Sequence, residues 1–189
     1  DDVVITFNQN PSTATAGLDQ TALCGLNSAT LAGNTPSIGS GNWTILSGSG
    51  GSFSNSNLPN SIFVGTAGNS YNLQWTISNS PCAASNDNVL ISFPLNPSTS
   101  SAGTDQTLCG ATSATLAGST PTVGNGSWSI VSGGSGNFSS ASNPSATFTP
   151  SSGTVFTLRW TVSNSPCSAS SDDVVISFLQ NPTIANAGS

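Results

Sequence analysis

Four cysteines are the residues of this sequence with the best-defined chemistry. They form two pairs of equal spacing, Cys24 with Cys82 and Cys109 with Cys167, each separated by 58 positions. The sequence has no Cys-x-x-Cys spacing and no histidine, which disfavours zinc. The spacing predicts one disulfide within each pair, located at one pole of its domain, with buried free thiols as the alternative. Disulfides imply an oxidising compartment outside the cytoplasm, and each would add about 4 kcal/mol in the chain-entropy model.

Catalytic residue types are scarce. The acidic residues are seven aspartates, the only cation is Arg159, and histidine, lysine and glutamate are absent. A general base would have to be an aspartate, and an activated serine would lack its usual partner. Asp172 and Asp173 are neighbours on a predicted strand, so their side chains point to opposite faces and cannot share a proton. The sequence therefore predicts a protein that is not an enzyme.

The aspartates are also the candidates for metal binding. Four of them lie near a junction or lead into a final strand: Asp19, Asp87, Asp105 and Asp172. Hard carboxylate oxygens suit calcium, but this ion usually takes six to eight oxygen ligands. Aspartates at turns and strand starts also form local hydrogen bonds with the backbone. We therefore expect no cofactor, with calcium at these four residues as the alternative.

The elements that must position these residues occur twice in the chain. Five residues recur 85 positions later, namely Trp43, Phe53, Trp75, Cys82 and Phe93 as Trp128, Phe138, Trp160, Cys167 and Phe178. A solenoid repeat has about 20–50 residues, so a period of this length is a whole small domain. The sequence predicts domains at residues 9–95 and 96–180.

The two flanking segments resemble parts of the same repeat. Residues 1–8 match the last strand of a repeat, and residues 181–189 match the start of one. We therefore expect two repeats from a longer array. The junctions at residues 94–97 and 179–182 are short and contain proline, which restricts bending and predicts a semi-rigid array.

Period-two alternation of apolar residues predicts β-strands throughout and no helix. It is clearest at residues 73–78 and 158–163, and it recurs at residues 43–45, 128–130, 89–93 and 174–178. Shorter candidate strands are residues 29–31, 114–116, 62–64 and 147–149. Clusters of Gly and Ser, as at residues 47–52 and 132–137, indicate turns and loops. About seven short strands per repeat predict an all-β fold of tandem immunoglobulin-like β-sandwiches.

The tryptophans allow two interpretations. Exposed rings could stack on sugars, but each of the four shares its strand face with Ile, Leu or Val. We therefore assign all of them to the core: Trp43, Trp75, Trp128 and Trp160. Tyr71 and Phe156, at the start of a strand, are slightly better candidates for exposure, with closure of the core as the alternative.

Charge excludes two classes of partner. The net charge is −6 with a single cation, so nucleic-acid phosphates would be repelled. Anionic membrane surfaces are disfavoured for the same reason. No apolar run approaches the ~20 residues of a membrane-spanning helix, so we expect no membrane insertion.

Several blocks of the sequence resemble a known family. They are residues 16–21, 102–107, 160–167 and 172–176. They are similar to the repeats of very large cell-surface proteins of gliding Bacteroidota, the mobile gliding-motility adhesins (SprB type). The sandwich itself resembles polycystic-kidney-disease (PKD-like) and immunoglobulin-like modules. The resemblance implies export by the type IX secretion system and a filament at the bacterial cell surface that grips the substratum.

These observations predict an extracellular repeat segment of a bacterial surface adhesin or filament. Its disulfide-stapled domains would form a semi-rigid array that supports adhesion. The expected partners are extracellular surfaces or polysaccharide, and neighbouring repeats of the same chain. Two alternatives are a polysaccharide-binding module and a self-associating fibre built by strand addition at an exposed sheet edge.

Overall fold

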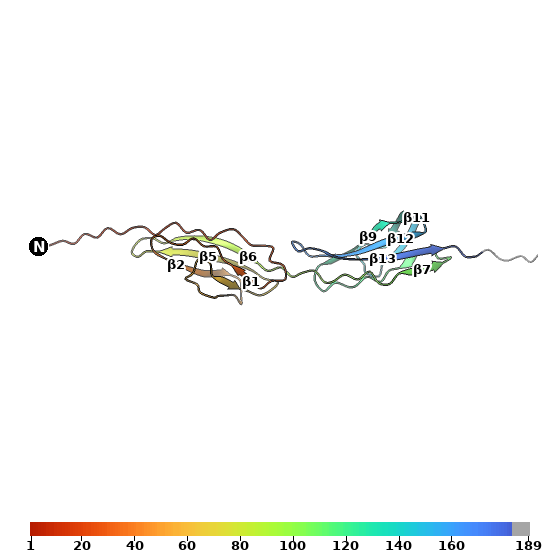
Figure 1. The fold of residues 1–189 in the computed structure, drawn as a ribbon, viewed down its shortest axis with the longest axis horizontal. Helices are drawn as coiled ribbons and strands as arrows, with labels where there is room; N and C mark the ends of the chain where they lie inside the picture. The colour runs from red at the N-terminus through yellow and green to blue at the C-terminus, as the bar shows by residue number, and fades with distance from the viewer. Residues whose placement is uncertain (183–189) are drawn as a thin grey trace, which may run out of the picture. The chain divides into compact units, whose positions relative to one another are not determined.

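The protein is an all-β chain of two compact units. The computed structural model describes residues 1–182, which contain strands and no helix (Figure 1). The units are Asp1–Leu95 and Asn96–Ser189, called repeat 1 and repeat 2 below. Each unit has two β-sheets around one apolar core, which confirms the immunoglobulin-like β-sandwich. Most of the predicted opening of a following repeat, residues 183–189, lies outside the described residues.

Repeat 1 is built from six strands. They are β1 (Ser28–Thr30), β2 (Ser40–Ser47), β3 (Ser52–Phe53), β4 (Ile62–Val64), β5 (Ser70–Ser78) and β6 (Ser85–Ser92). One sheet has the order β1-β4-β3, and the other has the order β2-β5-β6. All of these strand pairs are antiparallel.

Repeat 2 repeats this plan with one more strand. Its strands are β7 (Gln106–Cys109), β8 (Ala114–Thr115), β9 (Asn125–Ser132), β10 (Ser135–Phe138), β11 (Thr147–Ser152), β12 (Val155–Ser163) and β13 (Ser170–Leu179). The sheets have the orders β10-β11-β8 and β7-β13-β12-β9. The additional strand, β7, lies parallel to β13, whereas every other pair is antiparallel.

Three strands were not predicted, namely β3, β7 and β10. Part of β10 falls within residues 132–137, which were predicted to be a loop, and β3 starts at the last residue of the other predicted loop. The segments of β3 and β10 are rich in Ser and Gly and show no apolar alternation. They become strands because β4 and β11 supply their hydrogen-bonding partners, so tertiary pairing overrides local preference.

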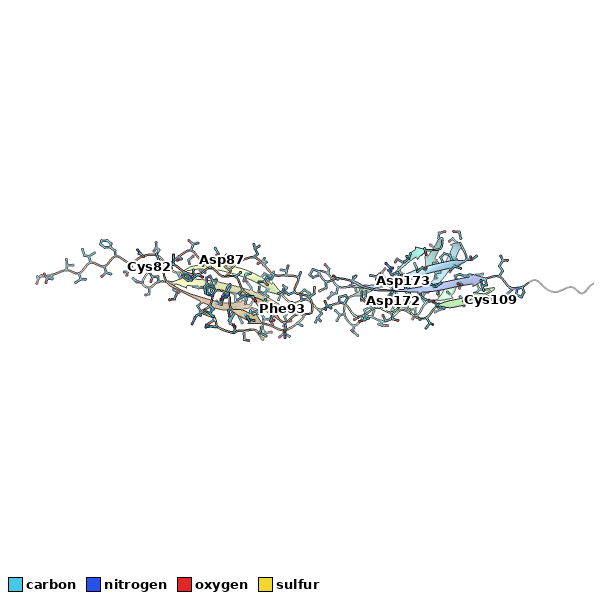
Figure 2. All side chains as sticks on the ribbon, in the orientation of Figure 1. Cys82, Asp87, Phe93, Cys109, Asp172 and Asp173 are labelled. Atoms are coloured by element: carbon cyan, nitrogen blue, oxygen red, sulfur yellow. The ribbon has the colours of Figure 1, made fainter. Side chains whose placement is uncertain are left out.

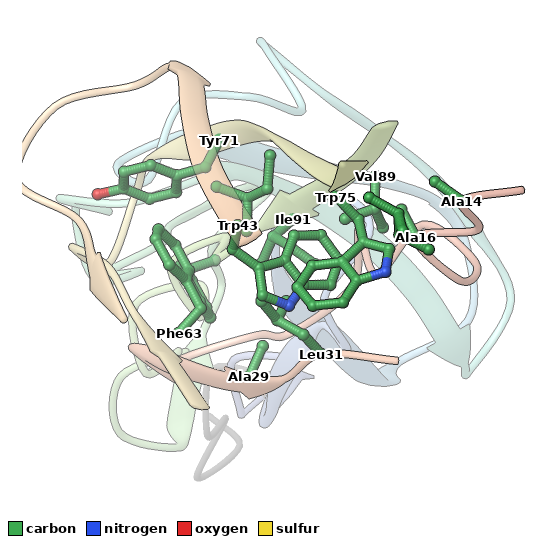
Figure 3. Packing of buried hydrophobic residues seen from close by; sticks show 13 residues of the cluster. Ala14, Ala16, Ala29, Leu31, Trp43, Phe63, Tyr71, Trp75, Val89 and Ile91 are labelled. Atoms are coloured by element: carbon green, nitrogen blue, oxygen red, sulfur yellow. The ribbon is translucent and has the colours of Figure 1, made fainter. Parts of the chain in front are cut away.

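The core of each repeat is organised around a pair of tryptophans. In β5 every second residue is buried, and Trp75 lies directly opposite Trp43 of β2, with ring centroids 5.0 Å apart (Figure 3). Trp160 and Trp128 form the same cross-strand pair in repeat 2, also at 5.0 Å. Both pairs are almost fully buried, so direct cross-strand packing fixes the register of the two central strands.

Two glycines make room for these rings. A Cβ atom at Gly41 would lie 2.1 Å from the Trp75 ring, and one at Gly126 would lie equally close to the Trp160 ring. No side chain fits at such a separation. The Gly-x-Trp sequence on β2 and β9 therefore serves to place one indole beneath the neighbouring backbone.

Residues 1–8 form no strand within the described part of the chain. Their apolar side chains are largely exposed, at 82% for Val3, 88% for Val4, 69% for Ile5 and 92% for Phe7. Residues 1–7 differ from residues 172–178 of β13 only at Thr6, which corresponds to Ser177. This segment therefore carries the sequence of a final strand without its partner strands.

Candidate functional site

Each repeat has an incoming end and an outgoing end. In repeat 1 the chain arrives beside the β5–β6 turn, where the Asn79 side chain donates a hydrogen bond to the Gln9 carbonyl at 2.7 Å. It leaves beside Gly25, whose N–H donates to the Pro94 carbonyl at 2.8 Å. We call these the incoming and outgoing ends, and β6 runs from the first to the second.

Repeat 2 has the same polarity. Near its incoming end Ser98 donates its N–H to Val123, just before β9, and the first residue of β9 pairs with Ser163 at the end of β12. At its outgoing end Gly110 donates its N–H to the Leu179 carbonyl at 2.8 Å. The β12–β13 turn and the end of β13 therefore mark opposite ends of this repeat.

The two cysteines of each repeat lie at these opposite ends. Cys82 lies in the β5–β6 turn at the incoming end, whereas Cys24 precedes Gly25 at the outgoing end. Figure 2 shows Cys82 and Phe93, the residue that follows β6, at opposite ends of repeat 1. In repeat 2 Cys167 precedes β13, and Cys109 is in register with Leu179 at its end.

The predicted disulfides within each repeat are therefore wrong. Cys109 and Cys167 are separated by the length of β13, which is about 30 Å at ~3.3 Å per residue. A disulfide requires Cα atoms within about 7 Å. Cys82 and Cys109 are free thiols, whereas Cys24 and Cys167 are disulfide-bonded. The prediction failed because it placed both cysteines at one pole, although the incoming segment and the final strand run in parallel.

The incoming segment is held against the final strand by side chains. In repeat 1 Ser85 Oγ accepts the Ala14 N–H at 2.9 Å, and Asp87 Oδ2 accepts the Ala16 N–H at 2.8 Å. We call each such Ser-x-Asp pair, Ser85/Asp87 in repeat 1 and Ser170/Asp172 in repeat 2, a side-chain clasp. Since Ala16 is buried, its amide depends on the aspartate for its hydrogen bond.

The clasp of repeat 2 has the same geometry. Ser170 Oγ accepts the Ser100 N–H at 3.0 Å, and Asp172 Oδ2 accepts the Ala102 N–H at 2.7 Å. The other two candidate aspartates act further along the same strand pair. Asp19 Oδ1 accepts the Leu90 N–H at 2.8 Å, and Asp105 Oδ1 accepts the Val175 N–H at 2.9 Å.

All four calcium candidates therefore hold the incoming segment and the final strand together. The described residues contain no group of three or more His, Cys, Asp or Glu side chains that could hold a metal ion. Within residues 1–182, no buried side-chain nitrogen or oxygen atom lacks a hydrogen-bond partner. The role that this geometry supports for the carboxylates is structural.

After the clasp, the backbones themselves pair in parallel. In repeat 2 β7 pairs with β13 from Gln106, opposite Ile176, to Cys109, opposite Leu179. In repeat 1 the pairing is reduced to one bridge, between Gln20 and Ile91. The incoming and outgoing strands of each repeat are thus direct neighbours that run in the same direction.

Within residues 1–182, the aromatic side chains that were candidates for exposure form no stacking platform on the sandwich faces. Tyr71 and Phe156, the candidates for exposure, are fully buried. The Tyr71 hydroxyl donates to the Ser49 carbonyl at 2.9 Å and accepts the Thr66 N–H at 2.8 Å. A depression of about 380 Å³ in repeat 1 is lined by Asp19, Asn72, Asn88, Val89 and Leu90, with no aromatic ring.

The strongest charge interaction of the described residues lies on the outer face of repeat 2. Arg159 of β12 donates two hydrogen bonds to Asp173 of β13, at 2.7 and 2.8 Å. The hydrogen bond from Arg159 lowers the pKa of Asp173, and the carboxylate raises the pKa of Arg159. Asp172 and Asp173 engage different partners, so they form no acid pair.

Sequence reasoning missed the clasp. A signal was present, because Ser-x-Asp precedes the apolar run of the final strand in both repeats. The two accepted amides, Ala16 and Ala102, each lie about 70 residues before their aspartate. Only the fold shows that these distant segments are neighbours.

Comparison with known proteins supports the fold. No family model and no curated protein matches the sequence. Immunoglobulin domains 1–5 of Sidekick-1 match with a TM-score of 0.54 and 12% identity, covering 92% of this chain and 40% of that one. At this identity the likeness shows an immunoglobulin-like β-sandwich and nothing narrower.

Two further solved structures are similar in part. The insect immune protein hemolin has a TM-score of 0.47 and 10% identity over 95% of this chain, which spans 49% of the hemolin chain. The complex of Dpr11 with DIP-gamma has a TM-score of 0.46 and 14% identity, covering 90% of this chain and all of that one. No helix in the described part of the chain is long and apolar enough to cross a membrane.

Proposed function

We propose that this chain is a load-bearing, extracellular repeat segment of a bacterial surface adhesin or filament. One observation carries the proposal: in both repeats the incoming segment lies parallel to, and directly beside, the final strand. A repeat that connects an anchor to a distant attachment point is pulled at its two ends. The arrangement of the incoming and final strands decides how the repeat resists this force.

Tension loads these strands in shear. The incoming strand is pulled toward its own N-terminus and the final strand toward its own C-terminus, so the pulling directions are opposite along one parallel pair. The hydrogen bonds between them lie across the strands. They must therefore break together, whereas bonds at a peeled edge break one after another. The side-chain clasp adds two further hydrogen bonds to this pair in each repeat.

Two sets of residues support the compartment and the setting that we propose. Disulfide bonding of Cys24 and Cys167 is typical of proteins outside the cytoplasm. The resemblance of residues 160–167 and 172–176 to the repeats of gliding-motility adhesins supports a filament of a gliding bacterium. On this account the repeats support adhesion as a semi-rigid array, and the adhesive contact lies elsewhere.

Surface binding tests this function. The purified chain is applied to polysaccharides, glass and hydrophobic surfaces, in calcium and in chelator. A supporting array predicts no saturable binding, and no change in melting temperature when calcium is removed. Saturable binding to a polysaccharide would overturn the spacer role, and a fall in melting temperature in chelator would assign the carboxylates to calcium.

A self-associating fibre is the second candidate, and the exposed segment 1–7 favours it. Its apolar side chains have no partner strand within the described residues, and it has the sequence of a final strand. Strand addition to another copy would bury it. Sedimentation of the chain with and without residues 1–7 decides this. The fibre candidate predicts oligomers that the deletion abolishes, whereas the array proposal predicts monomers in both cases.

A further inference from the structure

The larger sheet of repeat 2 has an edge strand that begins with the only Asn-Gly pair in the sequence, Asn125-Gly126. Asparagine is a thermolabile residue. A glycine after it lets the next backbone nitrogen approach the side-chain amide, because no Cβ atom stands in the way. Repeat 1 has Ser40 and Gly41 at the equivalent positions. The two repeats therefore differ in chemical reactivity at the same point of the fold.

The fold of repeat 2 requires both glycines beside Asn125. A Cβ atom at Gly126 would lie 2.1 Å from the Trp160 ring, so no larger residue fits there. Gly124 has a φ of +90°, which favours glycine, and a Cβ atom there would lie 2.5 Å from the Ser163 carbonyl oxygen. Neither neighbour in the chain therefore places a side chain beside the Asn125 amide.

Both reacting groups lie on the outside of the sheet. Asn125 is exposed and is the first residue of β9, and the ends of elements open most easily. The Trp128 N–H donates to the Ala141 carbonyl at 2.8 Å, so it points away from β12. Amides of alternate residues in a strand point to the same side, so the Gly126 N–H faces the outer edge as well. The backbone nitrogen next to Asn125 is therefore not part of the ladder between β9 and β12.

We propose that Asn125 is a site of spontaneous deamidation. The Gly126 nitrogen loses its proton and attacks Cγ of Asn125. A bond forms between these two atoms, the bond from Cγ to the side-chain nitrogen breaks, and that nitrogen takes up a proton and leaves as ammonia. Water then adds to one of the two carbonyl carbons of the cyclic imide and opens the ring. Opening at Cγ gives aspartate, and opening at the backbone carbonyl carbon gives isoaspartate.

Isoaspartate changes the geometry of repeat 2, because it places one additional methylene in the main chain before Gly126. In β9 Asn125 lies opposite Ser163 and Gly126 lies opposite Val162. A longer backbone cannot keep this register and also the close fit of Gly126 against the Trp160 ring. The reaction therefore weakens the start of β9, and repeat 1 is spared at this position. The inference concerns the lifetime of a repeat and is independent of the proposed function.

Asn42 of repeat 1 shows the protected case on the matching strand, β2. Its side-chain amide donates to Ser56 Oγ at 3.0 Å and to Asn57 Oδ1 at 2.8 Å. The next residue is Trp43, whose N–H donates to the Ser56 carbonyl at 2.8 Å. Hydrogen bonds hold both the side-chain amide and the backbone nitrogen that would attack it, so Asn42 should stay unmodified.

Peptide mapping of aged protein by mass spectrometry tests the proposal. The whole chain is stored in mildly alkaline buffer at physiological temperature, with a parallel sample unfolded in urea. In the folded chain, aspartate and isoaspartate should replace Asn125 before any other asparagine reacts. The rate should rise with pH, because the attacking nitrogen must lose its proton. Modification confined to the unfolded sample, or a first reaction at another asparagine, would overturn the proposal.

Two variants exchange the reactivity between the repeats. Asn125→Ser copies Ser40 of repeat 1 and should abolish the earliest mass change. Ser40→Asn places an asparagine before Gly41 and should add a second site in repeat 1, and its absence would contradict the structural argument. The aged unaltered protein should melt at a lower temperature than the fresh protein, whereas aged Asn125→Ser protein should not. Equal melting of the two aged proteins would overturn the effect on β9.

Discussion

The two repeats share their core but differ where the incoming segment meets the final strand. Repeat 2 forms a four-residue parallel strand, β7, against β13, whereas repeat 1 has a single bridge at the same register, Gln20 with Ile91. The cause is one residue. Repeat 1 reads Thr-Ala-Leu-Cys from Thr21 to Cys24, and repeat 2 reads Thr-Leu-Cys from Thr107 to Cys109.

Ala22 is thus an insertion that the strand pair absorbs. Pairing resumes beyond it. The Gly25 N–H donates a hydrogen bond to the Pro94 carbonyl, as the Gly110 N–H does to the Leu179 carbonyl in repeat 2, both at 2.8 Å. A bulge takes up one additional residue at a local cost in hydrogen bonds. The core therefore fixes where the incoming segment and the final strand begin and end, while the pairing between their two ends differs from repeat to repeat.

The largest expected effect tests the shared core. Trp75→Ala and Trp160→Ala should each destabilise their own repeat by about 3–5 kcal/mol, since both remove a fully buried indole. Because the two tryptophans are packed in the same way, the two losses should be similar. Urea unfolding followed by tryptophan fluorescence checks this, with Trp43 remaining in the mutated repeat of the first variant and Trp128 in that of the second. Clearly unequal losses would show that the cores are not equivalent.

The next effect concerns the clasp. Asp87→Ala and Asp172→Ala should each cost about 1–3 kcal/mol, because the buried Ala16 or Ala102 amide loses its acceptor. Asp173→Ala, at the neighbouring position on the outer face, is the matched control and should cost less. Thermal melting measures all three variants. A control as damaging as Asp172→Ala would remove the special role of the clasp.

Deletion of Ala22 should make repeat 1 resemble repeat 2. The parallel pairing can then continue past Gln20, and repeat 1 should gain about 1 kcal/mol from the restored hydrogen bonds. Insertion of alanine after Thr107 should weaken repeat 2 by a similar amount. Amide hydrogen exchange at Leu23 and Leu108 reports the change directly. No change in protection at Leu23 after the deletion would contradict the bulge explanation.

The smallest effect concerns the ion pair that repeat 1 lacks. Arg159 lowers the pKa of Asp173 below its unfolded value, so the pair stabilises repeat 2 above that unfolded pKa. This contribution is lost as the pH falls through the lowered pKa of the folded state. Arg159→Gln introduces the glutamine that repeat 1 has at the equivalent position, Gln74. It should abolish the part of the stability difference of repeat 2 between pH 7 and pH 2 that comes from the ion pair. Since both side chains are exposed, molar salt should reduce the effect as well.

Much of the fold was predictable because the central strands carry strong local signals. The alternation around Trp75 and Trp160 gave β5 and β12, and the apolar runs from Val89 and Val174 gave most of β6 and β13. β3 and β10 were missed because Ser- and Gly-rich segments become strands only when a neighbour pairs with them, and β7 was missed because its four residues are too few to show a period-two pattern. The sequence contains no local sign of that neighbour.

The site was less predictable because it depends on which distant segments lie together. Equal spacing identified the cysteines as two pairs but gave no information on the direction of the incoming segment, so Cys24 was assigned to the wrong end. The aspartates were predicted to be calcium ligands or partners of the local backbone, whereas the structure shows them bonded to backbone amides about 70 residues away. Their partners, the amides of Ala16 and Ala102, could not be predicted, because every residue except proline has a backbone N–H and residue type does not identify the donor.

Single-molecule pulling tests the central claim, that the parallel pair of incoming and final strands carries the load. The chain is held at its two ends in reducing buffer, so that only hydrogen bonds and packing resist. We predict two unfolding events at different forces, with the weaker one belonging to repeat 1, and deletion of Ala22 should raise it toward the stronger. Equal forces in the unaltered chain, or a weaker event that the deletion leaves unchanged, would contradict the account.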